Sequence, residues 1–324
     1  MPITTRLTRR LQIAHPILSA PMAFAAGGRL AAAVTNAGGL GFIGGGYGDA
    51  GWLEAEFLAA GNSSVGCGFI TWSLAKNPQL LDLVLERKPA AVFLSFGESK
   101  PFASRMAKAG VLFIQQVQTL VDAEVAIDAG AAVIVAQGAE AGGHGEKRAT
   151  MTLVPEVADL IARRSPDTLL CAAGGIADGR GLAAALMLGA DGVVVGSRLW
   201  ASAEALVHAN IHAAALAANG DQTVRQSVTD IARGYDWPAR FNIRVARNAF
   251  VDQWHGREDQ MRAQAAIEQP KYAAAVAAGD AGTAAVIVGE AVGLIHAIEP
   301  AAVIIQRMVH EAEALLKRGT ILAT

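Results

Sequence analysis

His144 is the residue of this sequence whose type and setting most clearly suggest chemistry. It lies in a glycine-rich stretch that follows an apolar run, Gln137-Gly138-Ala139-Glu140-Ala141-Gly142-Gly143-His144-Gly145-Glu146. An imidazole titrates near neutral pH, so it can remove or hold a proton without a large shift of its pKa. The glycines let the backbone approach a flat ligand closely. We expect His144 to act as a base in a ligand site, with Glu140 orienting either the imidazole or the loop.

Two further glycine-bearing segments predict a phosphate site. One is Ala172-Ala173-Gly174-Gly175-Ile176-Ala177-Asp178-Gly179, between an apolar run and a helix pattern, and the other is Val193-Val194-Val195-Gly196-Ser197-Arg198. Barrels of alternating strands and helices often bind phosphate with the loops after strands seven and eight. The alternative is that the glycines only turn the chain and Ser197 caps a helix. Arg198 either neutralises the phosphate or pairs at the surface.

A dinucleotide fingerprint at Gly39, Gly41 and Gly44 has the wrong context for its usual function. That pattern needs a strand before it and a helix after it, whereas here a helix pattern ends at Gly38 and an apolar run follows. We interpret these glycines as a helix end and a strand.

The elements that must position these residues alternate in a regular order. Short apolar runs separated by helical patterns predict eight strands. They lie near Pro16–Ser19, Leu40–Gly44, Val65–Ile70, Ala91–Ser95, Val111–Gln115, Ala132–Ala136, Thr168–Ala173 and Gly192–Val195. Three of the helix patterns end at glycines: Gly38, Gly130 and Gly189. Continuously apolar strands indicate a parallel sheet buried on both faces.

The pattern predicts an α/β fold, a (β/α)8 TIM barrel over residues 1–202. A doubly wound open sheet is the structural alternative. Residues 203–290, here called the cap segment, show helical patterns and scattered aromatic residues, and we expect a helical cap over the barrel mouth. Residues 291–324 hold a final helix, Ala301 to Lys317, expected to pack on the barrel. The cap aromatics Tyr235, Trp237, Phe241 and Trp254 either contact substrate or, for most of them, pack inside the cap.

Composition narrows the function classes. Hydrophobic residues make up 52% of the chain and charged residues 17%, which suits a folded enzyme with a large core. The net charge of −2 provides no general attraction for nucleic acid or an anionic membrane. No apolar run is long enough for a membrane span, and the first 18 residues lack the pattern of a signal peptide. We expect a cytoplasmic protein with no nucleic-acid or membrane partner.

The remaining candidates for metal or thiol chemistry are weak. Cys67 and Cys171 lie in predicted strands and are interpreted as buried free thiols. His208 and His212 are four residues apart, but no third ligand is evident, so we predict no metal site. His15 is interpreted as structural.

Taken together, these motifs resemble those of a known family. The chain is similar to the nitronate monooxygenases, formerly called 2-nitropropane dioxygenases, and to the related flavin-dependent enoyl-acyl-carrier-protein reductases and quinone reductases. The matching motifs are Ala20-Pro21-Met22, Gly38-Gly39-Leu40-Gly41, the stretch from Ala136 to His144, the stretch from Ala172 to Gly179, and Gly196-Ser197-Arg198. The similarity covers most of the chain.

This resemblance implies a cofactor and a reaction. It implies non-covalent FMN, held near Ala20, Met22, Gln137, Gly142, Gly143, Gly174, Gly175, Gly196 and Ser197. It implies that His144 removes the α-proton of a nitroalkane, that FMN takes electrons from the nitronate, and that dioxygen completes conversion to a carbonyl compound and nitrite. The alternatives are an NAD(P)H-dependent flavin reductase and a flavin-free scaffold. An oligomer is compatible with the sequence.

One position departs from the family. Many members carry an asparagine in the third strand that contacts the flavin, whereas this chain has Gly68 there. A glycine has no side chain with which to hydrogen-bond the flavin, so the flavin's potential or reactivity toward oxygen could differ. Thr71 or Ser95 could replace that contact.

Overall fold

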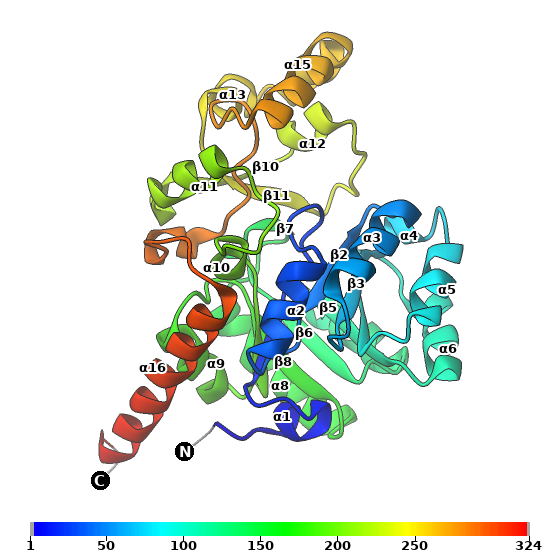
Figure 1. Cartoon of the computed structure of the whole chain (residues 1–324), viewed down its shortest axis with the longest axis vertical. Coiled ribbons are helices and arrows are strands. Elements are labelled where there is room, and N and C mark those ends of the chain that lie inside the picture. The colour runs from blue at the N-terminus through cyan, green and yellow to red at the C-terminus, as the bar shows by residue number, and fades with distance from the viewer. Residues whose placement is uncertain (1–2, 323–324) are drawn as a thin grey trace.

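Eight parallel strands form the central sheet of the computed structural model, which describes residues 3–322 (Figure 1). The strand order is β1-β9-β8-β6-β5-β4-β3-β2. Their bounds are β1 (Ile17–Ser19), β2 (Phe42–Gly46), β3 (Gly66–Ile70), β4 (Ala91–Ser95), β5 (Leu112–Val117), β6 (Val133–Gln137), β8 (Leu169–Ala173) and β9 (Gly192–Val195). Each of the eight strands predicted from the sequence is present.

The two ends of this sheet meet and close the barrel. Leu18 and Leu40 form an isolated parallel bridge between β1 and the residues before β2. The Leu40 N–H donates to the Ile17 carbonyl at 3.0 Å, and the Ser19 N–H donates to the Leu40 carbonyl at 3.0 Å. A closed parallel sheet with intervening helices is a (β/α)8 TIM barrel, as predicted, and the open-sheet alternative is wrong.

The helices that surround the barrel connect successive strands. They are α2 (Gly28–Asn36), α3 (Ala50–Ala60), α4 (Thr71–Leu74), α5 (Gln79–Glu86), α6 (Lys100–Ala109), α7 (Leu120–Asp128), α8 (Thr150–Arg164), α9 (Gly179–Met187) and α10 (Ser197–Trp200). The helices α2, α7 and α9 each end two residues before the glycine expected there, namely Gly38, Gly130 and Gly189. The short helix α1 (Arg6–Leu11) precedes the barrel.

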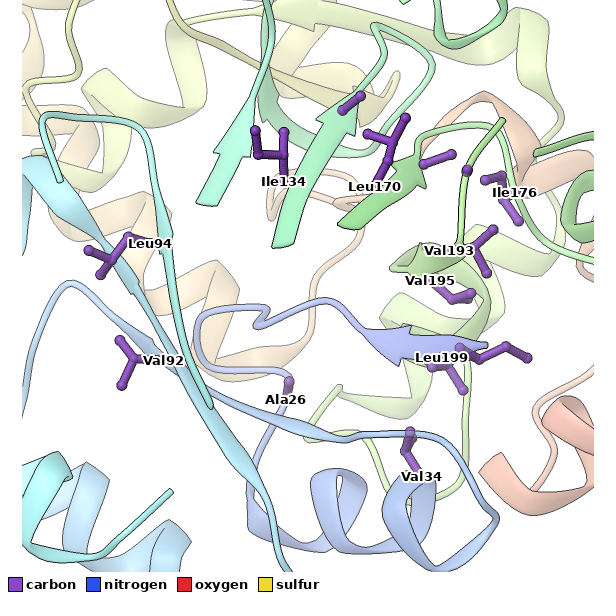
Figure 2. Packing of buried hydrophobic residues seen from close by; sticks show 14 of the residues in the cluster. Ala26, Val34, Val92, Leu94, Ile134, Leu170, Ile176, Val193, Val195 and Leu199 are labelled. Carbon is purple, nitrogen blue, oxygen red and sulfur yellow. The ribbon is translucent and has the colours of Figure 1, made fainter. Parts of the chain in front are cut away.

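Apolar residues of the strands divide into two clusters. Phe42, Phe93 and Val135 belong to the cluster that fills the barrel, together with Leu7 of α1. Alternate strand residues, such as Ile134, belong to the larger cluster beneath the outer helices (Figure 2). Burial on both faces explains why the strands are continuously apolar, as expected of a parallel barrel. Cys67 and Cys171 are buried free thiols within these strands.

The cap segment lies at one end of the barrel and contains both helices and strands (Figure 1). Its helical elements are α11 (Ala209–Leu216), η1 (Gly220–Gln222), α12 (Val228–Arg233), α13 (Ala249–Trp254), α14 (Glu258–Ala263), α15 (Ala265–Ala278) and the first residue of η2 (Glu290–Leu294). The sequence analysis did not predict its two strands, β10 (Thr223–Gln226) and β11 (Asn242–Ala246). They form an antiparallel sheet with β7 (Gly143–Gly145), in the order β10-β11-β7. The histidine stretch expected to be a loop is therefore partly a strand.

The last helix, α16 (Ala301–Leu322), packs against α9 and α2. Its buried residues Ile304, Ile305 and Met308 join the cluster beneath the outer helices. The helix runs along the side of the barrel, away from the cap segment (Figure 1). None of the helices in residues 3–322 combines the length and the apolar character needed to cross a membrane.

Candidate active site

His144 lies at the centre of β7, and the cap segment fixes its backbone. It is paired with Ile243 of β11 in the antiparallel register. Its Nε2 lies 2.9 Å from Oδ2 of Asp230 on α12, and both side chains are buried. A carboxylate only accepts hydrogen bonds, so in the neutral imidazole Nε2 carries the proton. Nδ1 is therefore the nitrogen left to accept a proton from a substrate.

The surroundings of His144 keep its imidazole neutral. Burial lowers the pKa of His144 below its usual value, while the hydrogen bond and the charge of Asp230 act in the opposite direction. Nearby Arg233 and Arg225 also lower the pKa. A buried, neutral imidazole with a carboxylate behind it can take up a proton and be stabilised once charged.

Aromatic rings from the barrel and the cap segment surround the imidazole. The indole of Trp237 stacks on it with 3.4 Å between the ring centroids and an angle of 8° between the planes. Phe96 meets it edge-on at 6.1 Å. The indole Nε1 of Trp237 donates to the hydroxyl of Tyr47 at 3.0 Å. The imidazole is therefore held in one plane by contacts on its face as well as at Nε2.

Glu140 orients the loop and not the imidazole. Its carboxylate accepts from the backbone N–H of Thr150 at 3.0 Å and from the Thr150 hydroxyl at 2.9 Å. Arg225 of β10 and Arg244 of β11 both donate to the carbonyl of Ala139. The distance is 3.0 Å from Nη2 of Arg225 and 3.0 Å from Nε of Arg244. Of the two alternatives for Glu140, orienting the loop is the one observed, because the partner of the imidazole is Asp230.

The two glycine-bearing loops after β8 and β9 expose backbone donors. Gly174 and Gly175 have φ angles of 101° and 74°, a conformation that glycine adopts without strain. Within residues 3–322, the N–H groups of Gly174, Gly175, Gly196 and Ser197 have no hydrogen-bond acceptor. A Cβ added at Gly196 would have only Ala20 nearby, at 3.7 Å. Unpaired N–H groups beside open space fit a bound phosphate.

The side chains of these loops have other partners. The hydroxyl of Ser197 accepts from the backbone N–H of Gly289 at 2.8 Å. Arg198 is buried and donates to Glu299 at 2.7 Å, so it pairs neither with a phosphate nor at the open surface. Any phosphate in these loops would be held by backbone groups.

All ten residues predicted for the site line one cavity at the barrel mouth. They are Ala20, Met22, Gln137, Gly142, Gly143, His144, Gly174, Gly175, Gly196 and Ser197. The side chain of Gln137 is fixed by Gln116 and Gln118, which donate to its Oε1 at 3.1 and 2.9 Å. Segments from both ends of the barrel sequence therefore converge on this cavity, and their role in holding a cofactor stays a prediction.

Asp230, Arg233 and Tyr47 are among the residues that contact the base or line the cavity and that the sequence analysis missed. Asp230 carries no local motif and lies in the first turn of α12, directly after Thr229. Arg233 and Tyr47 both line the cavity. Among the four cap aromatics, Trp237 lines the cavity and Tyr235 stacks on Tyr47 at 3.8 Å.

The other two cap aromatics pack within the protein. Phe241 meets Phe96 at 5.2 Å. Trp254 is buried in a cap cluster with Tyr272 and Phe250. Packing inside the protein is thus found for Phe241 and Trp254, while contact of Trp237 with substrate stays a prediction.

Gly68 packs so closely against Pro21 that there is no room for a side chain. A Cβ at this position would lie 2.3 Å from the Pro21 Cβ and 3.3 Å from the Phe93 carbonyl oxygen. An asparagine would therefore collide with the proline ring. Of the two residues that could replace its contact, Ser95 lines the cavity, whereas Thr71 is buried outside the lining.

The remaining histidines and glycines have structural partners. His208 caps α11 by accepting from the Asn210 N–H at 3.1 Å, and His212 Nε2 lies 2.9 Å from the Trp200 carbonyl. Within residues 3–322 no cluster of three His, Cys, Asp or Glu side chains is arranged to hold a metal. A Cβ at Gly41 would lie 1.8 Å from the Ala31 carbonyl oxygen, so that glycine allows α2 to pack on the barrel.

A family model and curated relatives identify the family of this chain. A family model described as nitronate monooxygenase matches residues 4–62 and 69–311. A nitronate monooxygenase of Neurospora crassa is 34% identical, over 93% of this chain and 90% of that protein. Nitronate monooxygenase npaC of Metarhizium robertsii is 37% identical, over 93% and 91%. The solved structure of FabK from Thermotoga maritima has a TM-score of 0.85 and 31% identity, covering 98% of each chain.

Proposed function

This chain belongs to the nitronate monooxygenase family, and on that premise we propose that it is an FMN-dependent enzyme that oxidises nitronates or nitroalkanes. Dioxygen would complete the conversion to a carbonyl compound and nitrite. One observation carries the proposal. The buried His144–Asp230 pair faces the same cavity as the unpaired backbone N–H groups of two glycine-bearing loops.

The unpaired backbone N–H groups at the cavity match the negative charge of the FMN phosphate. The N–H groups of Gly174, Gly175, Gly196 and Ser197 would hold the phosphate. Ala20, Met22 and Gln137, with the nearby glycines Gly142 and Gly143, would hold the rest of the cofactor. When bound, FMN supplies the site with an acceptor for two electrons.

His144 would perform the proton step. Its Nδ1 would accept the acidic proton on the carbon next to the nitro group, while Nε2 keeps its hydrogen bond to Asp230. The resulting imidazolium would be stabilised by that carboxylate, and the aromatic rings of Trp237 and Phe96 would keep bulk water from the imidazole face. A preformed nitronate has already lost this proton and would not need the base.

Anaerobic reduction of the purified flavoprotein tests the proposal. Rapid-mixing measurements would compare a nitronate, a neutral nitroalkane, NADH and NADPH, following loss of flavin absorbance. We expect the nitronate and the nitroalkane to reduce the flavin. Reduction by NADH or NADPH alone would show an NAD(P)H-dependent reductase instead, and a purified protein without a flavin spectrum would remove the FMN proposal.

A further inference from the structure

Arg233 is a largely buried cation with unused hydrogen-bonding capacity at the cavity. It is the last residue of α12, its side chain is 17% exposed, and it lines the cavity. Within residues 3–322 its guanidinium donates no hydrogen bond, and its Nη1 is fully buried without a partner. Leaving a buried charged donor unpaired is costly, so such groups in native sites commonly meet a ligand.

The one ion-pair partner of Arg233 in the described residues does not satisfy it. Nη1 lies 3.6 Å from Oδ1 of Asp230, which is beyond hydrogen-bond distance, and that oxygen is also buried without a partner. The other carboxylate oxygen of Asp230 is engaged by His144. Asp230 therefore compensates the positive charge of Arg233 but accepts no hydrogen bond from it.

The aromatic neighbours of Arg233 accept no hydrogen bond from its guanidinium. Its central carbon lies 4.8 Å from the ring centroid of Tyr235 and 5.7 Å from that of Tyr47. These are cation–π contacts with the aromatic rings, and the N–H groups of a guanidinium donate in its plane. Burial lowers the pKa of Arg233, but Tyr47 and Asp230 outweigh it, so the group is fixed as a cation. Nε and Nη2 have no acceptor among residues 3–322 and remain available to a planar anion in the cavity.

We propose that Arg233 binds the two oxygens of the reacting nitro group and stabilises the negative charge that they acquire. This assignment rests on the proposed function and names a further catalytic residue for it. A nitronate is planar with two terminal oxygens, which match the paired donors of a guanidinium as a carboxylate does. Asp230 and Arg233 lie three residues apart on α12, so one helix turn positions both the partner of the base and the anion site.

The charges balance through the proton step. Before it, His144 and the nitroalkane are neutral, and the charges of Asp230 and Arg233 cancel. The C–H bond breaks, an N–H bond forms at His144 Nδ1, and the electron pair moves into the new C=N bond, leaving the charge on the nitro oxygens. Afterwards imidazolium faces Asp230 and nitronate faces Arg233. Two matched ion pairs form and the buried site stays neutral, which avoids an uncompensated charge.

Equilibrium binding tests the anion site without turnover. The probe is propionate, a planar two-oxygen anion with the shape of nitroethane nitronate, titrated into the flavoprotein while flavin absorbance and tryptophan fluorescence are followed. We expect Arg233→Gln to weaken propionate binding at least tenfold and Arg233→Lys to weaken it less. The matched control is Arg262→Gln, which removes an exposed arginine of α14 and should bind propionate like the wild type. Unchanged binding by Arg233→Gln would overturn the inference.

Steady-state kinetics separate this inference from the proposed function. We expect Arg233→Gln to lower kcat/KM for nitroethane about 100-fold, in line with the loss of one donor to a developing oxyanion. In the wild type, propionate should compete with nitroethane nitronate, and this readout holds even if a variant fails to fold. Non-competitive inhibition, or full activity of Arg233→Gln, would remove the anion site and leave the function intact. Failure of all nitro compounds to reduce the wild-type flavin, with propionate binding still lost in Arg233→Gln, would remove the function and its nitro substrate and leave Arg233 as a site for planar anions.

Discussion

The imidazole of His144 lies parallel to the indole of Trp237, 3.4 Å away, although 93 residues separate them in the chain. One ring belongs to the barrel side of the site and the other to the cap segment. With Asp230 bound to Nε2, the imidazole has little freedom to rotate. The direction of Nδ1 is thus set by the fold before any substrate binds, as effective proton transfer requires.

Replacing His144 by alanine should lower activity with neutral nitroalkanes much more than activity with preformed nitronates. His144→Ala should retain flavin but lose about 10²- to 10⁴-fold in kcat/KM with neutral nitroalkanes, the range for a general base. Preformed nitronates should be affected much less, since their proton is already gone. Oxygen consumption with both substrates measures this, with the exposed His310→Ala on α16 as the control. An equal loss on both substrates would contradict the assignment of His144 as the base.

Replacing Asp230 by asparagine should move the pH profile. The base works only when unprotonated, so activity with nitroalkanes is lost as the pH falls through the pKa of His144. Asp230 raises that pKa against the effect of burial, so its neutral amide should lower it further. In Asp230→Asn the acidic limb of kcat/KM should therefore move to lower pH, and the plateau should fall about tenfold or more. A shift of the limb to higher pH would show that this carboxylate does not act on the imidazole.

An acidic side chain in the first phosphate loop should release the cofactor. Gly175→Asp adds bulk at a φ of 74° and a negative charge beside the expected phosphate. The ratio of flavin to protein after purification should fall. Gly130→Asp is the matched control, because Gly130 has a φ of 81° and open space around it at the end of α7. Equal flavin contents in the two variants would place the phosphate elsewhere.

Replacing Gly68 by asparagine should destabilise this chain. In Gly68→Asn the added atoms meet the Pro21 ring, and overpacking of this kind costs about 1–3 kcal/mol. Denaturant unfolding measures the loss of stability. Gly61→Asn introduces the same side chain at a φ of 61° with nothing within 4 Å, so it should cost much less. If both variants unfold alike, the contact with Pro21 does not explain the glycine.

The barrel could be predicted because its signals are local. The strands β4 and β9 have the predicted bounds, Ala91–Ser95 and Gly192–Val195, and β9 is an apolar run between Asp191 and Gly196. The ten predicted site residues meet because parallel strands of a barrel end at one rim. The division at residues 202 and 290, the cytoplasmic location and self-association stay predictions.

What could not be predicted depends on contacts between distant segments. Asp230 is 86 residues from His144, and no pattern around it marks a partner for an imidazole. The strand β7 contains two glycines and is formed only because β11 pairs with it. For β11 a signal was present, since Ile243 and Val245 alternate with Arg244, but the surrounding helical patterns obscured it.

The pairing of β7 with β11 has a consequence for how relatives of this chain can diverge. The segment that shapes the mouth also supplies the neighbours of the imidazole: Asp230, Trp237 and the strand beside it. A chimaera that exchanged residues 203–290 for those of a homologue would change substrate selection and proton affinity in the same step. Substitutions in the cap segment are therefore expected to change the choice of substrate and the proton affinity of His144 together.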